Sequence, residues 1–175
     1  PAQTIEQLPL EWFVSDGVVL DFDGREDGDA IGAADVEAAL STAGHEIKPL
    51  DVVLVRTGCD RWIDTAEYMA HGPGVTAEAT HWLYDRGVRV MGIDAWGWDR
   101  PLWMQAQEAI ESGEQGIFWE AHQADLAYSQ IERLVNLGSL PPEGFTVACF
   151  PLRLKGGSAA PARVVAIVED DHGAP

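Results

Sequence analysis

Short apolar runs alternate with helix-like segments along the first half of the chain, and this alternation limits the fold more than any other feature. Three runs rich in β-branched residues are bounded by Asp or Gly and are typical of buried strands: DGVVLDFDG (16–24), DVVLVRTG (51–58) and VRVMGID (88–94). Two segments between them have helical spacing of apolar residues: AADVEAALSTAG (33–44) and GVTAEATHWLYDRG (74–87). Two more strand candidates follow: FTVACFPLRL (145–154) and ARVVAIVE (162–169). This order predicts an α/β fold with a mixed sheet and flanking helices.

The expected helix ends agree with that reading. Gly44 is a plausible C-terminal cap of the first helix, because glycine adopts the left-handed conformation without strain. Thr76 is placed to cap the start of the second helix, and Gly87 to close it. The segment KGGSAAP (155–161) has no phosphate-loop spacing and predicts a hairpin connection between the last two strands.

Size and charge restrict the class of protein. A chain of 175 residues with 46% apolar residues fits one domain, which we expect over residues 1–168, with a frayed tail at 169–175. The net charge of −18 argues against nucleic-acid or anionic-membrane partners, although solubility alone also explains it. No apolar run reaches the ~20 residues that span a bilayer, and we expect a cytoplasmic protein without a signal peptide. Cys59 and Cys149 are expected to be reduced thiols.

The residues after the third predicted strand are the first candidate site. Ligands of open α/β sheets bind beyond the carboxyl ends of the strands, and Asp94, Trp96, Trp98 and Asp99 follow such an end within six residues. One interpretation is a substrate site, with the two tryptophans as an aromatic wall for a planar ligand. The other is a loop folded onto the core, with both aspartates accepting hydrogen bonds from nearby backbone N–H groups.

The second candidate is the pair His122 and Glu132 in GIFWEAHQADLAYSQIERLVNL (116–137), a segment whose pattern is that of an amphipathic helix. Imidazole and carboxylate suit a divalent metal such as Zn²⁺ or Mn²⁺. In one straight helix, ten residues span about 15 Å. Two ligands of one ion have donor atoms within roughly 4 Å of each other. The two residues therefore share a metal only if the helix breaks between them; otherwise His122 is an ordinary surface or cap residue.

Several segments, in order, resemble the metal-dependent hydrolase/cyclase family, which includes bacterial kynurenine formamidases and isatin hydrolases. They are TIEQLPLEWFVSDGVVLDF (4–22), DVVLVRTG, GPGVTAEATHWLYDRGVRVMGIDAWGWD (72–99), IERLVNLGSLP (131–141) and FTVACFPLRLKGGSAAPARVVAIV (145–168). The resemblance implies a swivelling β/β/α-type domain that forms dimers or higher oligomers. It also implies hydrolysis of an amide, formamide, lactam or ester-like bond by a metal-activated water.

The resemblance assigns metal ligation to His122 and Glu132 and leaves Zn²⁺ and Mn²⁺ open. The family's signature, His-x-Gly-Thr-His-x-Asp-x-Pro-x-His, supplies most ligands and the catalytic His; it would precede LPLEW, which here begins at residue 8. We therefore expect a missing N-terminal segment, as a separate chain or absent from this sequence, or else a short inactive homologue. The substrate is expected to be a small molecule, and the two tryptophans are compatible with an aromatic one. Trp96, Trp98, Asp94 and Asp99 are expected to contact it. The alternative is a non-catalytic binding or assembly subunit.

Overall fold

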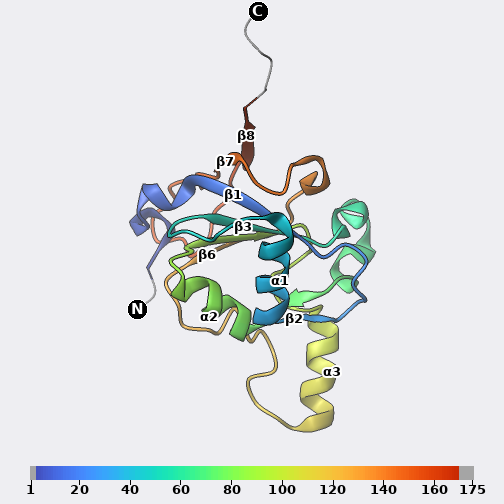
Figure 1. Ribbon diagram of the computed structural model, residues 1–175. Helices are drawn as coiled ribbons and strands as arrows, with labels where there is room; N and C mark the ends of the chain where they lie inside the picture. The colour runs from blue at the N-terminus through green and yellow to red at the C-terminus, as the bar shows by residue number, and fades with distance from the viewer. Residues whose placement is uncertain (1–2, 170–175) are drawn as a thin grey trace, which may run out of the picture.

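A six-stranded mixed sheet forms the centre of the molecule (Figure 1). The computed structural model describes residues 3–169. The strands lie in the order β6-β5-β3-β1-β7-β8. Their bounds are β1 Val14–Asp21, β3 Val52–Arg56, β5 Val90–Ile93, β6 Ser129–Ile131, β7 Phe145–Ala148 and β8 Val165–Val168. A small parallel pair lies apart from this sheet: β2 Ala30–Ile31 and β4 Gly74–Val75. The α/β class with a mixed sheet, predicted from the sequence, is confirmed.

Strands β1, β3, β5 and β6 run parallel to one another, whereas β7 and β8 are each antiparallel to their neighbours. In the register, Asp21 of β1 pairs with Arg56 of β3, and Gly92 of β5 pairs with Ile131 of β6. The carboxyl ends of the parallel strands therefore meet at one edge of the sheet. Glu132 follows β6 and Asp94 follows β5, so both come to this edge.

Helices α1 (Ala33–Ala43) and α2 (Ala77–Asp85) cover one face of the sheet (Figure 1). Each helix places apolar side chains at helical spacing against apolar residues of the strands. The shared core contains Val36 and Leu40 of α1, Leu83 of α2, and Val18 and Met91 of the sheet. At ~25 cal/mol per Å² of buried apolar surface, such packing is the main stabilising term of the fold.

The opposite face of the sheet is covered by segments without α-helix. Short 3-10 turns there are η1 Ile5–Gln7, η2 Leu10–Phe13 and η5 Leu137–Ser139, and two more, η3 Cys59–Trp62 and η4 Ala66–Ala70, follow β3. Phe13, Leu134 and Leu137 pack on this face against Val19 and Leu54 of the strands. The apolar strands predicted from continuous hydrophobic runs are thus buried on both faces, as expected for parallel strands.

The predicted ends of both helices are confirmed. The Thr76 hydroxyl accepts a hydrogen bond of 3.1 Å from the N–H of Ala79, and Gly87, at φ +91°, follows the C-terminal cap of α2. Gly44 caps α1 at φ +73°. Cys59 and Cys149 are both buried free thiols, as expected.

The region from 101 to 137 differs from the sequence analysis in two ways. Residues 102–112, where no helix was predicted, form α3 (Leu102–Ser112), which projects away from the sheet (Figure 1). It begins after Pro101 and ends at Gly113, at φ +69°, the usual asymmetry of helix ends. The segment 116–137 is not a helix: turns are followed by β6 and η5. Strand pairing with β5 and the left-handed residues Trp119 and Asp125 override its helical pattern.

The final strands are shorter than expected. Only Phe145–Ala148 and Val165–Val168 pair as strands, although Pro151 and Ala162 form an isolated bridge beyond them. The segment 155–161 lies in the connection between these strands, as predicted. The expected frayed tail lies, apart from Glu169, outside the described residues. Within residues 3–169, no helix has both the length and the apolar character to cross a membrane.

Candidate functional site

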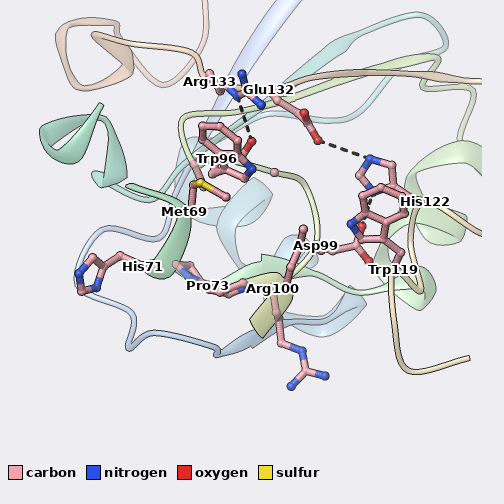
Figure 2. Close-up of a pocket in the computed structure, with 14 residues that line it drawn as sticks. Met69, His71, Pro73, Trp96, Asp99, Arg100, Trp119, His122, Glu132 and Arg133 are labelled. Carbon is pink, nitrogen blue, oxygen red and sulfur yellow. Dashed lines mark hydrogen bonds and ion pairs between the residues drawn. The ribbon is translucent and has the colours of Figure 1, made fainter. Parts of the chain in front are cut away.

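A cavity of about 230 Å³ lies at the carboxyl edge of the sheet (Figure 2). Trp96 and Asp99 reach it from the loop after β5, and Glu132 and Arg133 reach it from the residues after β6. His122 enters from the segment between α3 and β6. The position agrees with the rule that ligands of open α/β sheets bind beyond the carboxyl ends of the strands.

His122 and Glu132 face each other in the wall of this cavity. The imidazole Nε2 lies 3.4 Å from Glu132 Oε1, although ten residues of chain separate them (Figure 2). The straight helix that would have kept them apart is absent. The helical pattern is therefore broken between the two residues, which is what a shared metal requires. The structure therefore brings the two predicted ligands together.

Asp99 holds the other nitrogen of the same imidazole. Its Oδ2 lies 2.5 Å from His122 Nδ1, and its Oδ1 accepts a hydrogen bond of 2.9 Å from the N–H of Ala121. Asp99 is 6% exposed, so its carboxylate is shielded from water. This contact fixes the ring and leaves Nε2 directed at Glu132. The sequence alternative for Asp99, an acceptor for a nearby backbone N–H, is confirmed.

The two carboxylates change the charge of His122. Burial alone would lower the pKa of the imidazole, but its contacts with Asp99 and Glu132 outweigh burial and raise that pKa to about 9. The ring is therefore a cation at neutral pH in the absence of another ligand. A metal ion at Nε2 would have to displace that proton, because only the neutral imidazole ligates.

The loop that carries His122 is anchored by buried polar groups. Gln105 of α3, 1% exposed, accepts a hydrogen bond of 2.6 Å from the N–H of Trp119 and donates to the carbonyl of Arg100. The Tyr128 hydroxyl donates to the carbonyl of Ala121 at 2.9 Å. The Trp119 indole stacks on the His122 ring, with centroids 5.0 Å apart and planes 20° apart. These contacts fix a segment that has no regular secondary structure.

The donor set fits part of a divalent-metal site. Two donors 3.4 Å apart can each reach one ion at about 2 Å, and nitrogen with carboxylate oxygen suits Zn²⁺ or Mn²⁺. A histidine that binds a metal through one ring nitrogen usually donates a hydrogen bond from the other to a carboxylate, and Asp99 is placed to accept it from His122. In the part of the chain that the structure describes, no cluster of three or more His, Cys, Asp or Glu side chains could hold a metal ion. The residues present therefore fit a partial site.

Trp96 lines the cavity, but one face of its indole is already covered. The Cζ atom of Arg133 lies 3.6 Å from the centroid of the indole ring, and Arg133 Nε lies 3.5 Å from the carbonyl oxygen of Trp96. The edge of Tyr68 meets the ring at a centroid distance of 5.9 Å. Trp96 thus has the predicted position, while its contact with substrate stays a prediction.

Trp98 and Asp94 lie elsewhere, which corrects their assignment to the substrate pocket. Trp98 is fully buried, and its Nε1 donates to the Thr80 hydroxyl at 2.9 Å. Asp94 accepts hydrogen bonds of 2.7 and 2.9 Å from the N–H groups of Thr57 and Gly58. Burial raises the pKa of Asp94, and those hydrogen bonds oppose the shift. For Asp94, the alternative of a loop folded onto the core describes the structure.

Arg133 and Trp119 are pocket residues that the sequence reasoning missed. Both have left-handed backbones, with φ of +63° and +57°. Such a conformation costs a residue other than glycine about 1–3 kcal/mol, so surrounding contacts must hold it. The adjacency of Arg133 to Glu132, and of an aromatic pair to His122, was a usable signal. The backbone strain had no signature in the sequence.

Comparisons with known proteins identify the family and the fold of the chain. The Cyclase family model, described as "Putative cyclase", matches residues 1–100. Isatin hydrolase A from Ralstonia solanacearum shares 27% identity over 97% of this chain and 65% of its own, with a TM-score of 0.78. Isatin hydrolase A from Labrenzia aggregata, bound to benzyl benzoate, shares 26% over 96% and 66%, with a TM-score of 0.76. A search of curated proteins found no match.

A third solved structure, a potential metal-dependent hydrolase with cyclase activity, is 26% identical over 96% of this chain and 72% of its own, with a TM-score of 0.69. The chain spans less than two thirds of the length of the two isatin hydrolases. The match to the family model extends over more than half of the chain, from the first segment through the loop of Trp96 and Asp99. The chain therefore belongs to the cyclase family.

Proposed function

We propose that this chain is part of a metal-dependent hydrolase that cleaves an amide, formamide, lactam or ester-like bond with a metal-activated water. The observation that carries the proposal is the pair His122 and Glu132, whose donor atoms lie 3.4 Å apart at the carboxyl edge of the sheet. A divalent ion, Zn²⁺ or Mn²⁺, would supply a Lewis acid for the scissile carbonyl and lower the pKa of bound water.

The side chains of this chain have distinct parts in the proposal. Glu132 and His122 supply one oxygen and one nitrogen donor to the ion. Asp99 keeps the imidazole oriented through its 2.5 Å contact with Nδ1. Trp119, stacked on the imidazole, restricts the ring further and limits the access of water. These residues bind and position; the group that transfers protons belongs, in this proposal, to the segment that completes the site.

The comparisons support the chemistry at the level of class. One structural neighbour is described as a potential metal-dependent hydrolase, and two are isatin hydrolases. Benzyl benzoate, bound to one of them, is an aromatic ester, which favours an aromatic ligand here. An arylformamidase-like reaction, in which a formamide on an aromatic ring is hydrolysed, belongs to the proposed range.

A partner is also part of the proposal. Two protein ligands are too few for a catalytic zinc site, which usually has three with an open position. We propose that the remaining ligands come from an N-terminal segment, within the same protein or as a second chain, and that the assembled protein is a homo-oligomer. The two buried free thiols favour a reducing compartment such as the cytoplasm.

Replacing the proposed carboxylate ligand tests this function. Glu132→Gln keeps the size of the side chain but removes its charge, so metal content and hydrolysis should fall together, by at least about tenfold. The matched control is Glu111→Gln, an exposed carboxylate of α3 away from the cavity. The measurements are elemental analysis of Zn and Mn in the assembled protein and hydrolysis of a panel of aryl formamides, lactams and esters.

The outcomes separate the two function classes. Loss of metal and of hydrolysis in Glu132→Gln alone supports the hydrolase. Full metal occupancy in that variant would remove Glu132 from the ligands. If the assembled wild-type protein carries no metal and hydrolyses nothing, the non-catalytic binding or assembly subunit is the better account.

A further inference from the structure

The Arg133 side chain is stacked on the ring of Trp96. Ion pairs with carboxylates occupy many of the cations, including Arg25 with Asp35 and Arg100 with Glu108. None of the ion pairs found within residues 3–169 includes Arg133. Within residues 3–169, five of the eleven Lys and Arg side chains form such ion pairs, and Arg133 is one of the six that form none. Its position at a cavity makes it available to a ligand.

The guanidinium of Arg133 is held in one orientation. The N–H of Arg133 donates to the carbonyl of Ala95 at 3.1 Å, which fixes its left-handed backbone above the loop after β5. Its Cζ then lies 3.6 Å from the centroid of the Trp96 ring. Stacking on an aromatic face holds the planar group and leaves its N–H edge free to donate. Figure 2 shows Arg133 and Trp96 together at one side of the cavity, near Glu132.

Among the described residues, the only hydrogen bond from the Arg133 side chain is the long one from Nε to the Trp96 carbonyl. The four N–H groups on its Nη atoms have no protein acceptor there. A guanidinium matches a carboxylate in two parallel hydrogen bonds, which gives both strength and geometry. The free edge of Arg133 therefore has the form of a receptor for a planar anion.

The cavity has room for a ring beside that anion. Met69, Pro73 and Leu102 supply apolar wall around its volume of about 230 Å³. A cavity of roughly 150 Å³ holds benzene. A single aromatic ring with a carboxylate thus fits the volume and the chemistry. Neutral ligands of the same shape would fit the walls but leave the guanidinium edge to water.

We propose that Arg133, stacked on Trp96, binds the carboxylate of an aromatic acid in this cavity. The assignment rests on the proposed function in one respect: hydrolysis of an aroyl ester or amide, or of a lactam whose carbonyl is attached to an aromatic ring, releases an aromatic carboxylate, so the ligand is the product of such a reaction or an acidic substrate. The net charge of −18 would otherwise repel such an anion. Arg133 is then a specificity-determining residue that selects anionic aromatic ligands over neutral ones.

Benzoate and benzamide test the inference, because they share a ring and a shape but differ in charge. Binding of each is measured by isothermal titration calorimetry with the wild-type chain, which needs no turnover. The wild-type chain should bind benzoate more tightly than benzamide. Arg133→Gln should weaken benzoate binding by about tenfold and leave benzamide binding unchanged, as the loss of a charged hydrogen-bond donor predicts. The affinity of Arg133→Lys for benzoate should fall between those of the wild type and of Arg133→Gln.

The control is Arg163→Gln, which removes the same charge from an exposed position outside the cavity. Equal weakening in this control would reduce the effect to net charge and overturn the proposal. So would equal binding of benzoate to the wild type and to Arg133→Gln, or absence of benzoate binding by the folded wild-type chain. Circular dichroism of each variant verifies the fold.

The result is distinguishable from a failure of the proposed hydrolase. If Glu132→Gln abolishes metal binding while Arg133→Gln leaves benzoate binding intact, the hydrolase stands and the role of Arg133 is wrong. If benzoate binding depends on Arg133 in a protein that takes up no metal, the anion site stands and the hydrolase is wrong.

Discussion

Asp94 connects two neighbouring strands at their carboxyl ends, which makes it a structural residue next to the site. It follows β5, and its carboxylate accepts hydrogen bonds from the backbone N–H groups of Thr57 and Gly58 after β3, at 2.7 and 2.9 Å. Its own carbonyl accepts a hydrogen bond of 2.7 Å from the Tyr68 hydroxyl. The loop that carries Trp96 thus starts from a fixed point.

Replacing Asp94 by Asn should destabilise the fold. The amide presents one N–H group where the carboxylate accepted a hydrogen bond, so a buried donor faces a donor. We expect the free energy of unfolding to fall by about 2 kcal/mol. Urea denaturation measures it, with the exposed Asp64→Asn as the control. An unchanged unfolding midpoint in Asp94→Asn would show that the hydrogen bonds to the Asp94 carboxylate contribute little.

His45 lies between two carboxylates near the amino ends of β1 and β3, at the sheet edge opposite the cavity. Its Nε2 lies 2.8 Å from Asp51 Oδ2, and its Nδ1 lies 2.9 Å from Glu143 Oε2. Burial alone would lower the pKa of His45, but the contacts with Asp51 and Glu143 raise it above its usual value. Lys48, paired with Asp16, adds a further charge nearby.

That raised pKa predicts how stability depends on pH. The folded state binds the proton more tightly than the unfolded state does, so the contribution is complete below the unfolded value of about 6.5. It is lost as pH rises through the raised folded-state pKa. The stability difference between the wild type and His45→Gln should therefore shrink from about pH 5.5 to about pH 9. Urea denaturation at both pH values measures this difference, with the exposed His81→Gln as the control. A stability difference between the wild type and His45→Gln that grew with pH would contradict the prediction.

At the scale of elements, α3 matters to the site through a single buried side chain. Gln105 connects the helix to the loop of Trp119 and His122. Replacing Gln105 by Leu leaves the N–H of Trp119 without that acceptor. Amide hydrogen exchange over residues 117–123 should then speed up by about tenfold, the effect of one lost hydrogen bond.

The control for this element is Gln107→Leu, two residues along α3. Gln107 is exposed and contacts only Glu111 of the same helix among the described hydrogen bonds. Exchange in the loop should stay as in the wild type. Equal exchange in Gln105→Leu and the wild type would mean that Tyr128 and Asp99 hold the loop without help from α3.

The elements with strong local patterns were predictable. The β-branched runs of β1, β3 and β5 and the caps of α1 and α2 follow from local chemistry. The segment from 116 to 137 was not, because its apolar spacing suits a helix. What decides its structure is the pairing of residues 129–131 with β5 and the hydrogen bonds that Gln105 and Asp99, which lie outside the segment, accept from its backbone. A hydrogen bond within the segment, from the Tyr128 hydroxyl to the Ala121 carbonyl, adds to them.

At the scale of the whole molecule, the site depends on how four segments meet at one edge of the sheet. His122 and Glu132 were predicted from a family resemblance, and their facing positions needed the break that the structure shows. The contact of Asp99 with His122, 23 residues apart, and the stacking of Arg133 on Trp96 are tertiary relations. No spacing in the sequence encodes them, which is why Arg133 was missed and Trp98 was misassigned.

The central claim about the whole molecule is that this chain contributes one nitrogen and one oxygen ligand to a metal site. It covers less than two thirds of each of the two isatin hydrolases it matches, and its described residues hold two facing donors. The account thus predicts measurable metal affinity at His122 and Glu132, weaker than that of a complete site.

Isothermal titration calorimetry of the metal-stripped chain with Zn²⁺ tests that claim. The account predicts binding of one ion by the wild type and by Glu111→Gln, and binding at least about tenfold weaker by Glu132→Gln. Equal affinity in the wild type and Glu132→Gln, or no uptake of Zn²⁺ by the wild type, would contradict it.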